Sequence, residues 1–74
     1  MRNKKYHVVF KLWTGSWYMD GTKCYDRTVE VRSNSIRYIN SVMFKNFSEI
    51  DILCGKVDTF DMNGNFDKDT EDCD

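Results

Sequence analysis

Residues 5–32, KYHVVFKLWTGSWYMDGTKCYDRTVEVR, decide the fold because they predict two strands joined by a tight turn. Between residues 5 and 14, apolar side chains alternate with mostly polar ones, and a period of two is typical of a strand with one buried face. Asp20-Gly21 is a strong hairpin signal, since both central positions of a two-residue turn favour positive φ. We therefore expect a second strand over about residues 22–32, and we read Gly15 as a bulge or bend in the first strand.

A turn at residues 20–21 predicts the register of the hairpin. It places Leu12 opposite Val29, Phe10 opposite Val31, and Lys11 opposite Glu30. The apolar pairs then share one face and the charged pair lies on the other, which supports the turn assignment. The face expected to be buried carries Tyr6, Val8, Phe10, Leu12, Tyr25, Val29 and Val31.

The rest of the chain predicts one helix and a third strand. Ser33, Asn34 and Ser35 are all good N-cap residues. After them, apolar residues recur every three or four positions and predict an amphipathic helix of about four turns, with Ile36, Ile39, Met43, Phe47 and Ile50 on its buried face. A third strand is expected over about residues 51–61, weakened by Gly55.

The order strand, strand, helix, strand predicts an α+β class with a β-β-α-β topology. The simplest crossover places the third strand beside the first, which gives a three-stranded, mainly antiparallel sheet of order 2-1-3 with one helix packed on one face. The chain of 74 residues has room for one such domain, expected over residues 1–66. Residues 67–74 read as an acidic, solvated and mobile tail.

Composition narrows the functional classes. Residues 1–37 hold eight Lys or Arg and three acids, a net charge of +5, whereas residues 38–74 hold three Lys and nine acids, a net charge of −6. No apolar run is long enough to cross a bilayer, and the basic start lacks the apolar block of a signal peptide. The three cysteines are widely spaced and odd in number, which disfavours a disulfide framework. We expect a cytoplasmic protein.

Two tryptophans raise the main functional question. In the predicted register they lie on the face opposite the helix, where exposed apolar clusters often mark interfaces. The predicted partner-binding residues are Trp13, Trp17, Met19, Lys11 and Arg32. The competing interpretation is that the strand breaks at Gly15 and one indole plugs the end of the core.

The acidic residues carry a second hypothesis. Their carboxylates are expected to steer approach to a basic target or to mimic nucleic acid, unless they only solubilise the chain. They are Asp58, Asp61, Asp67, Asp69, Glu71 and Asp72. Read as a calcium loop from Asp61, the same segment has Phe66 where the EF-hand pattern needs glycine, so calcium binding is disfavoured.

No catalytic, metal or cofactor signature is recognisable. His7 is a lone histidine, Cys24 has no evident activating base, and no His/Cys pair has metal-ligand spacing. We therefore expect a protein that is not an enzyme and that needs no cofactor.

These observations predict a small intracellular protein-binding module, an inhibitor or adaptor that works by occupying a partner's surface. By analogy, the profile suits virus-encoded proteins that block host machinery and antagonise host defence. The alternative is a single-stranded nucleic-acid-binding protein that stacks bases on the Trp13/Trp17 sheet face. The third candidate is a homodimer whose aromatic patch is the subunit contact.

Overall fold

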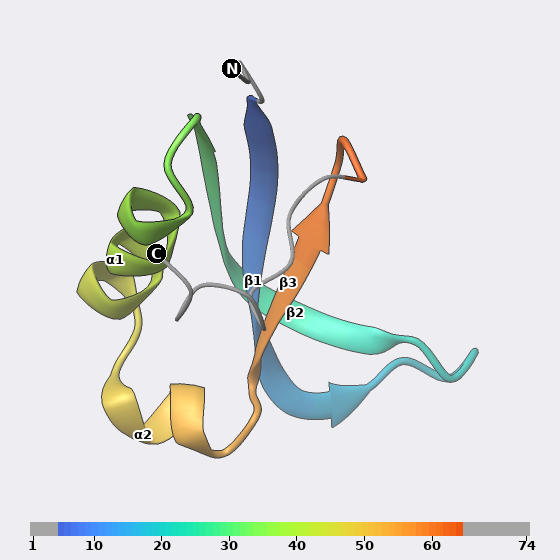
Figure 1. Cartoon of the computed structure of the whole chain (residues 1–74). Helices are drawn as coiled ribbons and strands as arrows, with labels where there is room; N and C mark the ends of the chain where they lie inside the picture. The colour runs from blue at the N-terminus through green and yellow to red at the C-terminus, as the bar shows by residue number, and fades with distance from the viewer. Residues whose placement is uncertain (1–4, 65–74) are drawn as a thin grey trace.

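The computed structural model describes residues 5–64 and shows the predicted small α+β domain (Figure 1). Its elements, in chain order, are β1 (Tyr6–Trp17), β2 (Lys23–Ser33), α1 (Ile36–Asn46), α2 (Glu49–Leu53) and β3 (Val57–Asp61). The three strands form one sheet of order β2-β1-β3, as the sequence predicts. The acidic segment 67–74 lies outside the described residues.

The connection through the helices returns the chain to the free edge of β1. Both β2 and β3 pair antiparallel with β1, so they are parallel to each other. Figure 1 shows α1 and α2 on the same side of the sheet, while the β1–β2 hairpin extends away from them. One face of the sheet is therefore left without a helix.

The core lies between α1 and the sheet. Its largest fully buried side chains are Phe10, Ile39 and Val8, and the rings of Phe10 and Phe47 meet edge to face with centroids 6.5 Å apart. The other buried hydrophobic residues are Val31, Met43 and Val57. The alternating residues of β1 thus meet the residues spaced by three and four on α1, as both periodicities require.

The predicted hairpin register is wrong by two residues. Phe10 lies opposite Val29, Lys11 opposite Thr28, and Leu12 opposite Arg27. Within residues 5–64 only glycines adopt positive φ, so Asp20 does not take the conformation that a two-residue turn needs. Instead, the Gly21 amide donates to the Tyr18 carbonyl, Gly21 has a φ of 91°, and the hairpin has a longer loop. Because the displacement is even, Phe10 and Leu12 keep the predicted face.

Two irregularities then change the faces near the turn. The register between β1 and β2 shifts between Trp13 and Trp17 and again between Leu12 and Trp13. Trp13 lies opposite Tyr25. The second shift leaves Asp26 as an extra residue in β2, and a bulge of this kind reverses the alternation beyond it. Tyr25, predicted to be on the buried face, consequently lies on the opposite one.

The single long helix and the long third strand are also corrected. Ser35 is the N-cap of α1, since its side chain accepts from the Tyr38 amide, but α1 ends at Asn46. Ser48 then caps α2, over residues that were expected to end the helix and begin the strand. Gly55, with a φ of 78°, ends α2: its amide donates to the Ile52 carbonyl and the Lys56 amide to the Asp51 carbonyl, which is the Schellman pattern.

Candidate functional site

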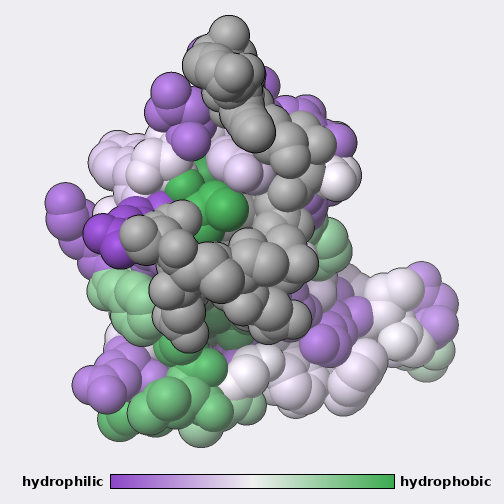
Figure 2. Space-filling model, viewed as in Figure 1, coloured by the Kyte–Doolittle hydropathy of each residue, from purple (hydrophilic) through white to green (hydrophobic). Residues whose placement is uncertain are grey.

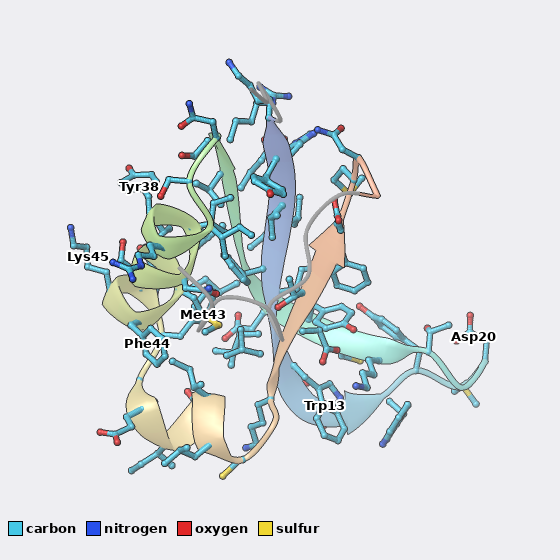
Figure 3. All side chains as sticks on the ribbon, in the orientation of Figure 1. Trp13, Asp20, Tyr38, Met43, Phe44 and Lys45 are labelled. Atoms are coloured by element: carbon cyan, nitrogen blue, oxygen red, sulfur yellow. The ribbon has the colours of Figure 1, made fainter. Side chains whose placement is uncertain are left out.

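The face of the sheet opposite α1, called the open face below, gathers the aromatic and basic residues of the three strands. Along β1, Lys11 and Trp13 alternate with the core residues Phe10 and Leu12, and Figure 3 shows Trp13 near the base of the hairpin, away from α1. Neither helix covers this face (Figure 1). Its residues include Val9, Lys11, Trp13, Trp17, Lys23, Tyr25, Asp58, Phe60 and Met62, and the pairing of β1 with β2 places His7, Thr28, Glu30 and Arg32 on the same face.

The two tryptophans meet at one end of the open face. Their rings pack edge to face with centroids 5.2 Å apart. The Trp13 indole donates to the Ser16 carbonyl at 2.8 Å, across the irregular segment that contains Gly15. Trp13 is half-buried, whereas 56% of Trp17 remains exposed. The indoles therefore form an ordered pair on the surface, and neither belongs to the core under α1.

A lysine, a carboxylate and a phenol connect this pair to the middle of the face. The Lys23 ammonium lies over the Trp13 and Trp17 rings, 5.0 and 5.9 Å from their centroids. It also donates to an Asp58 carboxylate oxygen at 3.0 Å, and the Tyr25 hydroxyl donates to the same oxygen at 2.6 Å. These contacts span β1, β2 and β3, so they hold the rings in fixed positions.

Lys11 occupies the other half of the open face. Its ammonium lies 5.5 Å from the centroid of the Tyr25 ring and 5.4 Å from that of Phe60, and these two rings meet edge to face at 6.1 Å. Cations placed in this way over aromatic rings are attracted by about 0.5–1 kcal/mol at exposed sites. The face is thus an alternating array of rings and ammonium groups.

Two predicted binding residues lie apart from this array of rings and lysines. Met19 is fully exposed in the hairpin turn. Arg32 lies opposite His7, and its guanidinium is 3.5 Å from the Glu30 carboxylate, which also bonds His7. The bond from His7, followed by the charge of Arg32, lowers the pKa of Glu30. The structure therefore brings together Trp13, Trp17 and Lys11. Arg32 lies on the same face at the end far from the tryptophans, and Met19 lies in the turn.

The predicted acidic residues divide into two sets. Asp58 is engaged by Lys23 and Tyr25, and one Asp61 oxygen accepts from the backbone amides of Asn63 and Gly64 at the end of β3. Asp67, Asp69, Glu71 and Asp72 lie outside the described residues. The two described carboxylates thus have internal roles, and the rest of the hypothesis concerns the undescribed segment.

Sequence reasoning missed four residues of the open face, Lys23, Tyr25, Phe60 and Met62, because their positions depend on the bulges and on the true start of β3. It also missed a set of exposed apolar residues on the helices, of which Leu53 is 77% and Phe44 58% exposed. Figure 2 shows hydrophobic surface at the lower left, where α2 lies. Ile50, expected on the buried face of one long helix, is 73% exposed, because α1 ends at Asn46 and Ile50 belongs to α2.

Comparison with protein-family models, curated proteins and solved structures found no match to this chain. Across residues 5–64, no cluster of three or more His, Cys, Asp or Glu side chains is arranged to hold a metal ion. None of the helices in that range combines the length and the apolar character that a membrane crossing requires.

The hydrogen bond from the Tyr25 hydroxyl to Asp58 can be tested by titrating the phenol. It raises the pKa of the Tyr25 phenol above its usual value, with a further contribution from burial. A phenol whose pKa is raised by folding keeps its proton at a pH where the unfolded chain has lost it. The hydrogen bond of Tyr25 therefore stabilises the fold fully below pH 10, and this stabilisation falls as the pH rises above 10. We expect the difference between the ultraviolet titrations of wild type and Tyr25→Phe to show a midpoint above 10. A midpoint at or below 10 would contradict the bond.

Proposed function

We propose that this protein is a protein-binding module, an inhibitor or adaptor that occupies a partner's surface with its open face. The observation that carries the proposal is the array of rings and lysines on a sheet face that neither helix covers. Tryptophan, tyrosine, phenylalanine and methionine are enriched at the centres of protein interfaces. Here they lie side by side instead of being scattered.

The order within the array supports binding. Trp13 and Trp17 are held against each other, and Lys23 is held by Asp58 and both indoles. Side chains that are fixed before binding lose less conformational entropy when a partner immobilises them, which is the advantage of preorganisation. The exposed apolar residues of α2, Ile50 and Leu53, are aliphatic and cannot form ring or ion contacts of this kind, so α2 provides the comparison surface.

The arrangement of charges favours a protein partner over single-stranded nucleic acid. Base stacking needs accessible ring faces and lysines that can contact phosphates. On the open face, the ammonium groups of Lys11 and Lys23 lie over the rings that would stack, and Lys23 is already paired with Asp58. A nucleic acid would have to displace these contacts.

Three forms of the protein test the proposal as baits in extracts of the native cell. Wild type and Ile50→Ser/Leu53→Ser, which changes exposed residues of α2, are expected to retain the same partner. Trp13→Ala/Trp17→Ala is expected to bind that partner about 100-fold or more weakly, because each hot-spot residue contributes ~2 kcal/mol or more. Circular dichroism and thermal unfolding verify that each bait is folded.

Two results would overturn the proposal. One is equal capture by the folded double tryptophan variant, and the other is loss of capture only in the α2 variant. If the double variant unfolds, Trp17→Ala replaces it, since that indole is largely exposed. Binding of fluorescent oligonucleotides at low salt would favour the nucleic-acid function, and concentration-dependent light scattering that disappears in the tryptophan variant would favour the homodimer.

A further inference from the structure

A notch lies on the open face between β1 and β3. It has a volume of about 210 Å³ and is lined by Val9, Lys11, Phe60 and Met62. Val9 and Phe60 are cross-strand partners, and the Met62 amide continues the pairing by donating to the His7 carbonyl at 2.8 Å. The walls of the notch are thus apolar side chains held by paired backbone, with one lysine among them.

The size of the notch limits its occupant. About 210 Å³ is far more than a single water molecule needs. Pockets for drug-sized ligands are larger, about 300–1,000 Å³. The notch therefore has room for one large apolar side chain.

Lys11 gives the notch its charge. The other lysine of the open face, Lys23, is paired with Asp58 at 3.0 Å, whereas none of the ion pairs formed within residues 5–64 includes Lys11. The rings of Tyr25 and Phe60 flank the Lys11 ammonium. Asp58, which lies opposite Lys11 on β3, is bonded to Lys23 and Tyr25 instead. An incoming carboxylate can therefore approach a cation that is already positioned beside an apolar pocket.

We infer that the notch recognises a segment of a partner protein in which a large apolar side chain is next to a carboxylate. The apolar side chain fills the space between Val9, Phe60 and Met62, and the carboxylate pairs with Lys11. This inference rests on the proposed function and specifies the chemistry of the partner. A basic segment is disfavoured because its charge would meet the Lys11 ammonium at the mouth of the notch.

The inference is tested with three short acetylated peptides that differ only in a central pair of residues. Their binding is followed by the chemical shifts of the backbone amides of the full chain. The Glu-Phe peptide is expected to shift the amides of Val9, Lys11, Phe60 and Met62. The Gln-Phe peptide is expected to bind the same site roughly two- to fivefold more weakly, the range for losing one exposed ion pair. The Glu-Ser peptide is expected to produce no saturable shift, because it has nothing to fill the notch.

Lys11→Met provides the decisive comparison, because it keeps the apolar stem and removes the charge. The variant is expected to bind the Glu-Phe and Gln-Phe peptides equally well. Lys45→Met is the matched control, since Lys45 is exposed on α1 and points away from the sheet (Figure 3). It is expected to prefer the Glu-Phe peptide as wild type does.

The inference is overturned if the Glu-Phe peptide shifts other amides, if wild type does not discriminate Glu-Phe from Gln-Phe, or if folded Lys11→Met retains the preference. Equal binding of the Glu-Ser peptide would also overturn it, because charge alone would then explain the affinity. These failures leave tryptophan-dependent capture intact, so they are distinguishable from failure of the proposed function. The converse result is binding of the peptides at the notch while capture of the partner does not depend on Trp13 and Trp17. That result would contradict the proposed function of the whole open face and not the chemistry of the notch.

Discussion

Phe10→Ala is expected to lower the free energy of unfolding by about 3–5 kcal/mol. Phe10 is fully buried and packs edge to face on Phe47. Removing a buried phenylalanine side chain costs about 3–5 kcal/mol, since transfer free energy is lost and a cavity remains. A chain of this length has a free energy of unfolding of about 4–11 kcal/mol, so the change removes about a quarter of it or more. Denaturant unfolding followed by circular dichroism measures the loss.

Phe44→Ala is the matched control for this prediction. Phe44 is 58% exposed on α1, and Figure 3 shows it on the outer side of the helix, whereas Met43 points to the sheet. Exposed substitutions of this kind usually change stability by less than about 0.5 kcal/mol. Equal destabilisation by Phe10→Ala and Phe44→Ala would mean that α1 presents a different face to the sheet.

The fold could be predicted because the strand alternation and the helical spacing of apolar residues are compatible with few arrangements. The alternation through Phe10 and the spacing through Ile39 and Met43 each define one apolar face, and a small domain must bury both faces against each other. Strand order followed from the crossover. These features depend on which side chains are apolar, which the sequence displays directly.

The register could not be predicted, because it depends on backbone irregularities that side-chain patterns do not specify. The Asp20-Gly21 pair is compatible with turns of several lengths, and only the position of Gly21 in the loop distinguishes them. The extra residue at Asp26 has no sequence signal that we recognise. The predicted fold is nevertheless correct, because a register shift of two residues moves no side chain to the other face of the sheet.

The boundary between helix and third strand was missed for a different reason. Ser48, with an acid three positions later at Asp51, is a helix-start signal within a region that already continued the apolar spacing of α1. Gly55 was read as weakening a strand, although a glycine at that position also ends a helix. Two correct local signals were thus overruled by a longer pattern.

The candidate site was predicted in part. Trp13 lies on the open face with Lys11 because it continues the alternation of the first strand, and the irregular segment at Gly15 brings Trp17 back against Trp13. Tyr25 was assigned to the core because its face depends on the bulge beyond it. The neighbours from β2 and β3 depend on register, and register was the weakest part of the prediction.

Gly15→Val is expected to separate the two indoles and to destabilise the protein by about 1–3 kcal/mol. Gly15 has a φ of 93°, which a β-branched residue adopts only under strain. In a regular strand, residues four apart are separated by roughly 13 Å. The Trp13 and Trp17 centroids are only 5.2 Å apart, because the chain loops out between them. Flattening this loop should abolish the exciton couplet of the paired indoles in circular dichroism.

Gly21→Val is the control for Gly15→Val. It distinguishes the effect of that substitution on the indole pair from the general effect of backbone strain. Gly21 has a φ of 91°, and a Cβ at this position would meet no other atom within 4 Å, so valine there carries comparable backbone strain at the turn. We expect a similar loss of stability with the couplet retained. A couplet that survives in Gly15→Val would mean that the indoles are paired without the loop. If it disappears only in Gly15→Val, one glycine fixes the geometry of the tryptophan pair, and partner binding should weaken in that variant and not in Gly21→Val.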